Sequence, residues 1–127
     1  MSKKHIELGA AGEAAALHYL SKHGYVIREK NLKSRLGEID IIAREKDTLC
    51  FIEVKTRSDL QKGYPQEAIT PHKQRQIARV ALQYVKKNNL FGKKTRFDIV
   101  SIIVGDEGTP RIKLIKNAFD VDCSYNY

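Results

Sequence analysis

Residues 37–55, GEIDIIAREKDTLCFIEVK, contain two short apolar segments, 38–43 and 48–55, separated by a polar turn. This pattern predicts two strands joined as a hairpin through residues 44–47. Four charged residues interrupt the strands where side chains should fill a core: Glu38, Asp40, Glu53 and Lys55. A buried charge is costly unless it is paired or binds a cation. The stretch therefore predicts a functional site as well as a hairpin.

The segments around this hairpin complete an α/β pattern. Residues 6–23 have helical periodicity, and Gly24 is well placed just beyond the helix end. Thr70 and Pro71 form the start of a second helix that continues to about residue 88. The other expected elements are a short strand at 25–27, a polar connection at 28–36, a loop at 57–69, strands at 97–104 and 111–119, and a turn at 105–110. The order α-β-β-β-α-β-β predicts an α/β fold with helices flanking a mixed β-sheet, partly parallel around the strand–helix–strand crossover.

Length and composition predict one domain over residues 1–127, with a tail from Asp120 that shows no pattern. Hydrophobic residues make up 42% of the chain and charged residues 30%, as in globular proteins. No apolar run approaches the roughly 20 residues of a membrane span, and the N-terminus does not resemble a signal peptide. Cys50 and Cys123 form no disulfide framework or metal spacing, and Cys50 is expected to be a buried, inert thiol. A cytoplasmic location without membrane contact is the expectation.

The net charge of +8 is concentrated in one segment. Between Ala68 and Phe97 there are eight basic residues and no acidic one, whereas fifteen basic residues balance fifteen acidic ones in the rest of the chain. The eight are Lys73, Arg75, Arg79, Lys86, Lys87, Lys93, Lys94 and Arg96. Such a concentration is typical of a surface that faces a polyanion, although solvated charged faces also occur on many small basic proteins.

Strand alternation places the charged residues of the hairpin together. Glu53 and Lys55 follow apolar residues on one face of the second strand. If the two strands pair, Asp40 lies across from or diagonal to Glu53. In the first helix, Glu13 lies at the centre of an apolar arc whose small residues would let the helix approach the sheet. We therefore expect Glu13 to reach the same pocket as Asp40 and Glu53.

Clustered carboxylates repel one another, and one of them takes up a proton unless a cation lies between them. Mg²⁺, or Mn²⁺ in its place, is usually held by one or two carboxylates together with water and phosphate oxygens. The ammonium of Lys55 would stabilise the charge that grows on a phosphate under attack. The pattern predicts metal-assisted phosphodiester hydrolysis. A Glu–Lys pair on a strand is by itself more often a solvated ion pair, so the prediction depends on its combination with Glu13 and Asp40.

The segments GEIDIIA and LCFIEVKTR, with GAAGEAAALHYLSKHGYVI before them and RFDIVSI after them, resemble the YraN family of small bacterial proteins over about residues 9–103. The resemblance implies a restriction-endonuclease-like fold of the PD-(D/E)XK nuclease superfamily, similar to archaeal Holliday-junction resolvases. It implies catalytic roles for Asp40, Glu53 and Lys55, and metal ligation by Glu13, Asp40, Glu53 and the backbone carbonyl of Val54. The proline that precedes the superfamily aspartate is Ile39 here, which departs from the generic motif.

The expected partner is nucleic acid, and first of all branched or single-stranded DNA, read through its backbone and shape. The helix from residue 71 to 88 has a cationic stripe suited to a phosphate backbone. The residues expected to contact nucleic acid are Lys33, Arg35, Arg57, Lys73, Arg75 and Arg79. Resolvase-like relatives act as dimers, because a four-way junction needs two symmetric cuts, so the resemblance also raises a homodimer.

Two other functions fit part of the pattern. A nucleic-acid-binding adaptor on a nuclease fold would keep the basic segment and treat Glu13, Asp40 and Glu53 as a structural cluster. A hydrolase acting on sugars would use a pair of carboxylates. The basic surplus and Lys55 argue against the sugar hydrolase, because an oligosaccharide has no charge to attract them.

Overall fold

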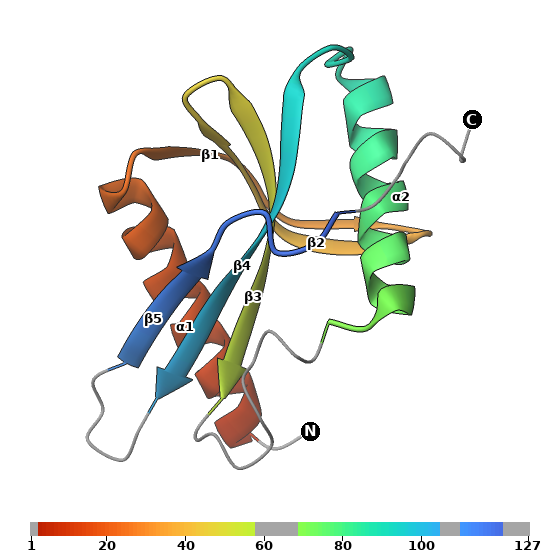
Figure 1. Cartoon of the computed structure of the whole chain (residues 1–127). Coiled ribbons are helices and arrows are strands. Elements are labelled where there is room, and N and C mark those ends of the chain that lie inside the picture. The colour runs from red at the N-terminus through yellow and green to blue at the C-terminus, as the bar shows by residue number, and fades with distance from the viewer. Residues whose placement is uncertain (1–2, 58–68, 105–109, 121–127) are drawn as a thin grey trace.

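The computed structural model describes residues 3–57, 69–104 and 110–120, with side chains from residue 11 onward. Its helices and strands follow the order that the sequence predicts, α-β-β-β-α-β-β (Figure 1). They are α1 (Lys3–Lys22), β1 (Tyr25–Ser34), β2 (Gly37–Glu45), β3 (Thr48–Arg57), α2 (Pro71–Lys87), β4 (Lys94–Val104) and β5 (Pro110–Ile115). The fold is therefore a mixed α/β arrangement, as predicted. No helix within the described ranges is long and apolar enough to cross a membrane.

All five strands belong to one sheet, in the order β1-β2-β3-β4-β5. β3 and β4 are parallel, with Thr48 opposite Lys94 and Arg57 opposite Ile103. The other neighbouring strands are antiparallel. α2 lies between the two parallel strands in the chain, which confirms the predicted crossover. α1 and α2 lie on opposite faces of the sheet (Figure 1).

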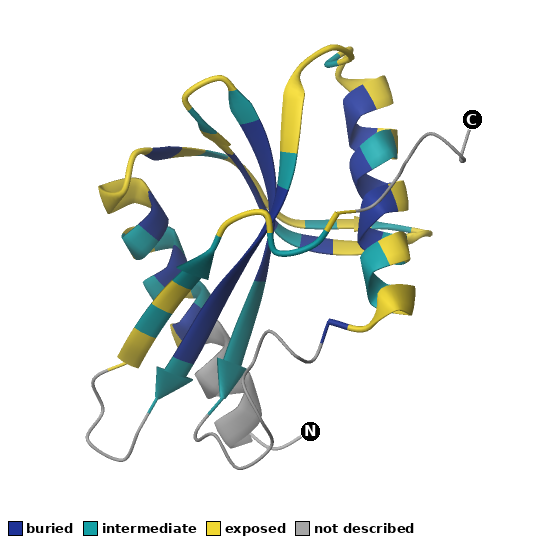
Figure 2. Cartoon of the chain, viewed as in Figure 1, coloured by how far each residue is buried: buried dark blue, intermediate teal, exposed yellow. Residues whose placement is uncertain are grey.

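Alternating side chains of the strands form two cores, one under each helix (Figure 2). The core under α1 contains Ala16 and Leu20 of the helix, together with Ile41, Cys50, Ile52, Val100 and Ile102 of the strands. The core under α2 contains Ile77, Val80 and Tyr84 of the helix, together with Ile42, Phe51, Phe97 and Ile99 of the strands. Cys50 is fully buried, as predicted.

The start of α2 follows the capping signal in the sequence. Thr70 has an extended backbone, and its Oγ1 accepts a hydrogen bond of 3.2 Å from the N–H of Lys73. Pro71 occupies the first turn, where its missing N–H leaves no bond unmade. This cap fixes Lys73 in the first turn of the helix, beside the strands that carry the acidic residues.

β1 corrects the sequence prediction. The polar residues 28–34, expected to belong to a connection, continue the strand, so that it extends from Tyr25 to Ser34. β1 pairs antiparallel with β2, and its register shifts between Ile27 and Glu29. Most of its side chains beyond Tyr25 are exposed because β1 is an edge strand. Backbone pairing with β2, rather than burial, accounts for this strand, and an apolar pattern therefore cannot reveal it.

β5 is shorter than predicted and ends at Ile115 instead of residue 119. Asn117 adopts a left-handed backbone conformation, with φ of 53°. Its N–H donates to Asp98 Oδ1 at 3.0 Å, and the N–H of Ala118 donates to the carbonyl of Phe97 at 2.8 Å. These bonds to β4 end the strand. Residues 58–68 of the loop expected at 57–69, residues 105–109 of the turn expected at 105–110 and residues 121–127 of the tail expected from Asp120 lie outside the described residues.

Candidate active site

A pocket lies where the sheet divides. β2 pairs with β3 from Glu45–Thr48 to Ile41–Ile52; further along, β2 continues beside β1 while β3 continues beside β4 (Figure 1). The first turns of α2 complete its wall. We call this cavity of about 240 Å³ the fork pocket; its lining residues are Glu38, Asp40, Glu53, Val54, Lys55, Lys73, Gln76 and Ile77.

Asp40 is the residue of β2 next to the last pair with β3. Its Oδ2 accepts a hydrogen bond of 2.8 Å from the backbone N–H of Val54. The carboxylate therefore satisfies a donor of β3 that the separating strand β2 no longer reaches with its backbone. This bond holds Asp40 at the point of separation, in the same pocket as Glu53.

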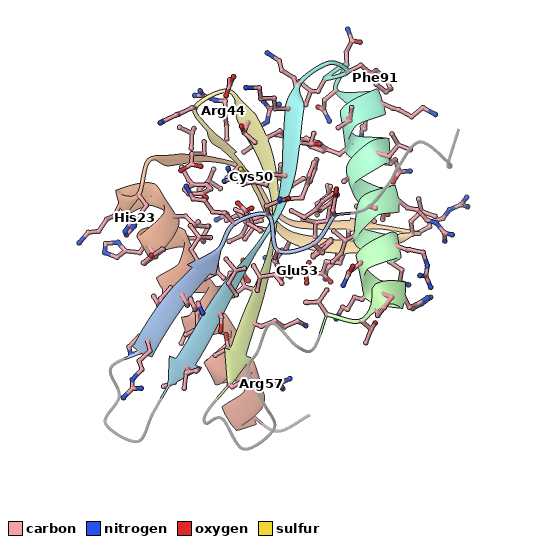
Figure 3. The ribbon with its side chains drawn as sticks, viewed as in Figure 1. His23, Arg44, Cys50, Glu53, Arg57 and Phe91 are labelled. Carbon is pink, nitrogen blue, oxygen red and sulfur yellow. The ribbon has the colours of Figure 1, made fainter. Side chains whose placement is uncertain are left out.

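Glu53 lies between β3 and α2 and is only 5% exposed (Figure 3). Its Oε1 is buried and has no hydrogen-bond partner among the described residues. Burial, and secondarily the charge of Asp40, raises the pKa of Glu53 to about 8. Burial also raises the pKa of Asp40, and Glu38 adds to this effect, whereas the N–H of Val54 and the charge of Lys55 oppose it. Two carboxyl groups that resist ionisation side by side are suited to share a cation.

Two lysines face these carboxylates. Lys55 is half-buried on β3, and Lys73 belongs to the first turn of α2. Burial lowers the pKa of Lys55, and the neighbouring ammonium of Lys73 lowers it further, while Glu53 and Asp40 act in the opposite direction. The positive end of the α2 dipole lies on the same side. The fork pocket thus combines sites for a cation and for an anion.

The acidic residues of the fork pocket fit a hard divalent ion. Asp40 and Glu53 provide carboxylate oxygens, one of which lacks a partner among the described residues, and Val54 also lines the cavity. No group of three or more His, Cys, Asp or Glu side chains within residues 11–57, 69–104 and 110–120 is placed to hold a metal. A pair of carboxylates is within the range of protein ligands that Mg²⁺ takes in proteins, where waters or phosphate oxygens complete its coordination.

The structure does not bring Glu13 into the fork pocket. Its side chain is half-buried on α1, and its Oε1 accepts a hydrogen bond of 2.8 Å from Nδ2 of Asn31 on β1. Its charge contributes to the raised pKa of Asp40 only as the last of the causes. Glu13 therefore lies near enough to act on Asp40 through space, but it does not line the cavity.

Of the six residues expected to contact nucleic acid, the structure brings Lys73 into the fork pocket and places the other five outside its lining. Lys73 lines it, and Arg75 and Arg79 are exposed further along α2. Lys33, near the end of β1, and Arg35, in the turn between β1 and β2, are both exposed. Arg57 ends β3, and its Nε is buried without a hydrogen-bond partner among the described residues (Figure 3).

Sequence reasoning assigned no role to Gln76, which lines the fork pocket from α2. The available signal is its spacing, because Gln76 follows Lys73 by three residues and shares that side of the helix. Glu38 also lines the cavity, and alternation along β2 explains why it accompanies Asp40.

A second charged cluster lies at the opposite end of the hairpin and is structural. Asp98 is fully buried and accepts hydrogen bonds from Arg96 Nε at 2.8 Å and from the N–H of Asn117 at 3.0 Å. Arg96 also contacts Tyr25 and Glu45, each at 2.9 Å. Every carboxylate oxygen of Asp98 thus has a donor, which distinguishes this cluster from the fork pocket.

The fold and the fork pocket define an α/β protein with a buried carboxylate–lysine site. The model of the Uncharacterised protein family UPF0102 matches residues 12–102. The chain therefore belongs to the UPF0102 family, which confirms the resemblance to YraN proteins drawn from the sequence.

Relatives in three bacteria support this assignment over most of the chain. The UPF0102 protein of Acetivibrio thermocellus is 49% identical, over 87% of this chain and 89% of its own length. That of Geotalea uraniireducens is 46% identical over 90% of both chains. That of Trichlorobacter lovleyi is 44% identical, over 90% of this chain and 91% of its own length.

Proposed function

We propose that this protein is a metal-dependent nuclease that hydrolyses phosphodiester bonds of DNA, with a fold of the PD-(D/E)XK nuclease superfamily. The observation that carries the proposal is the environment of Glu53. It is buried beside Asp40 with an oxygen that has no partner among the described residues, and Lys55 and Lys73 face it across the same cavity. A structural ion pair would leave no carboxylate oxygen without a donor, as the satisfied Asp98 illustrates.

Five residues of the fork pocket have a defined task in this proposal. Asp40, Glu53 and the carbonyl of Val54 would hold Mg²⁺ or Mn²⁺, which, when bound, supplies Lewis-acid activation of a phosphate oxygen and of water. The ammonium of Lys55 stabilises the negative charge that grows on the phosphate. Lys73 binds the phosphate from α2 and orients it toward the carboxylates.

The charge distribution supports nucleic acid as the substrate. Arg75 and Arg79 follow Lys73 along α2, and Lys33 and Arg35 lie in the β1–β2 hairpin. These cations are suited to bind the phosphates on either side of the cleaved bond. By the similarity to Holliday-junction resolvases, the proposal extends to branched or single-stranded DNA, to a homodimer and to a cytoplasmic location.

A cleavage assay on labelled duplex, single-stranded, flapped and four-way-junction DNA tests the proposal. Asp40→Asn is expected to lower metal-dependent cleavage at least about 100-fold, because a carboxylate that holds the ion is lost. DNA affinity in EDTA should stay the same or rise. Asp47→Asn is the matched control, since Asp47 is an exposed carboxylate in the β2–β3 turn and does not line the fork pocket. Cleavage that survives in Asp40→Asn would refute the assignment.

An adaptor that binds nucleic acid without cutting it is the second candidate. Two observations favour it. No group of three or more metal-ligating side chains is placed to hold an ion among the described residues, and Ile39 replaces the proline of the generic motif. Binding of every DNA structure without cleavage in Mg²⁺ or Mn²⁺ would establish the adaptor. Calorimetric titration should then detect no metal site that Asp40→Asn removes.

A further inference from the structure

A second cavity lies further along α2. We call it the α2 hollow; it has a volume of about 330 Å³ and is lined by Leu36, Arg79, Leu82, Gln83 and Lys86. Leu36 comes from the turn of the β1–β2 hairpin, and the other four residues come from α2. Neither metal chemistry nor folding explains why a leucine is 43% exposed at this position.

The hairpin turn is fixed in place above the helix. The N–H of Leu36 donates to Oγ of Ser34 at 3.0 Å, which closes the turn. The next residue, Gly37, lies against α2, where a Cβ atom would be 3.5 Å from Val80 and 3.7 Å from Gln76. Leu36 is therefore an exposed apolar side chain on a positioned turn, and a ligand that covers it needs no reordering of the backbone.

The composition of the α2 hollow indicates the chemistry of its occupant. Leu36 and Leu82 offer an apolar surface, and Gln83 adds an amide with both donors and an acceptor. Arg79 and Lys86 are exposed, and neither takes part in an ion pair among the described residues. A flat apolar group with polar edges that is linked to phosphates matches this set, and a nucleotide has those properties.

The distance to the fork pocket suits one continuous nucleic-acid strand. Gln76 lines the fork pocket, and Arg79 lines the α2 hollow one turn later on the same helix. The α2 residues that line the fork pocket lie within Lys73–Ile77, and those that line the α2 hollow lie within Arg79–Lys86. The midpoints of these two segments are about seven residues apart, which is about 11 Å along the helix axis. That length corresponds to about three base steps of B-form DNA.

We propose that the α2 hollow binds an unpaired nucleobase of the strand whose phosphate occupies the fork pocket. The base lies against Leu36 and Leu82, while Arg79 and Lys86 contact the flanking phosphates. A base within an intact duplex is stacked and paired, so the hollow selects substrates with unpaired nucleotides, such as single strands, bulges and branch points. This inference deepens the proposed function and depends on it for the identity of the ligand as nucleic acid.

A protein partner fits this cavity less well. Two of its five lining residues are apolar, whereas a stable protein interface buries about 800 Å² per partner over roughly 20–30 residues a side, around an apolar centre. The cations at its rim favour a polyanion.

Fluorescence anisotropy in EDTA tests the inference without requiring cleavage. The probes are DNA of about 12 nucleotides as a single strand, as a blunt duplex and as a duplex with one unpaired thymine, together with a single-stranded RNA. Leu36→Ser is expected to weaken binding of the single strand and the bulged duplex about fivefold and to leave the blunt duplex within about twofold. Phe91→Ser, another exposed apolar residue, should change none of them.

A matched pair tests the cationic rim. Lys86→Gln should weaken binding of the single strand about threefold more than Lys87→Gln, because both lysines are exposed at the end of α2 and only Lys86 lines the hollow. The RNA probe tests whether the hollow distinguishes ribose from deoxyribose. An equal effect of Leu36→Ser on RNA and DNA binding means that the hollow contacts the base and not the sugar.

Three results would overturn the inference: unchanged single-strand affinity in Leu36→Ser, an equal loss on the blunt duplex, or a change confined to self-association of the protein in sedimentation.

The nuclease proposal and the base-site inference can fail independently of each other. Leu36-dependent binding without any cleavage removes only the nuclease, whereas Asp40-dependent cleavage without a role for Leu36 removes only the base site.

Discussion

Glu53 is buried with an oxygen that has no hydrogen-bond partner among the described residues, and this arrangement predicts an effect of pH on folding in the absence of metal. The pKa of its carboxyl is raised from 4.5 to about 8, first by burial and then by Asp40. The folded chain thus holds a proton that the unfolded chain releases above pH 4.5. The contribution of Glu53 to stability is therefore complete below pH 4.5 and is lost as the pH rises through about 8.

We predict that Glu53→Gln removes this pH dependence. In EDTA, the free energy of unfolding of the unaltered protein should fall between pH 5 and 8, and the variant should exceed it at pH 8 by about 2–4 kcal/mol. Urea denaturation at the two pH values measures both quantities. Mg²⁺ should stabilise the unaltered protein at pH 8 and have no such effect on Glu53→Gln. Parallel pH profiles for the two proteins would show that the burial of Glu53 is not what limits stability.

At the scale of elements, the separation of β2 from β3 creates the site. Alternation within residues 37–55 reveals which side chains share a face, and this places Asp40 and Glu53 together from the sequence. The point of separation is set by where β2 leaves β3 to follow β1, and β1 beyond Ile27 has too few buried residues for its length to be recognised by pattern. For the same reason, the position of Glu13 beside Asn31 depends on a part of β1 that the sequence does not indicate.

Asp98 stabilises the end of the β2–β3 hairpin opposite the fork pocket. Its carboxylate accepts from the N–H of Asn117 after β5 and from Arg96, which also contacts Glu45 of β2. Removing the Asp98 carboxylate deprives Arg96 of one of its two carboxylate partners and leaves the N–H of Asn117 without its acceptor. Asp98→Ala is expected to lower the free energy of unfolding by about 3 kcal/mol in urea denaturation. Asp47→Ala is the control, because its pair with Lys94 is exposed at both ends, and its urea midpoint should not move. Equal effects of the two changes would contradict a structural role for the Asp98 cluster.

At the scale of the whole molecule, the two helices have different roles. α1 covers one core, and α2 covers the other while presenting its cations to solvent beside the fork pocket. The sequence predicts the cationic role of α2 because the basic excess coincides with one amphipathic helix, whose start is marked by Thr70 and Pro71. It cannot predict the α2 hollow, because Leu36 and Leu82 are far apart in the chain and meet only where the β1–β2 hairpin crosses α2.

The position of the charge leads to a prediction about salt. If α2 faces the phosphate backbone, each cation that contacts a phosphate releases counterions on binding. Arg75→Gln should then reduce the slope of log affinity against log salt concentration by about one unit on duplex DNA. Lys22→Gln should leave it unchanged, since Lys22 is exposed at the end of α1, on the opposite face of the sheet. Titrations by anisotropy at several salt concentrations in EDTA measure both slopes. Equal reductions by the two substitutions would mean that net charge, and not the α2 face, attracts the nucleic acid.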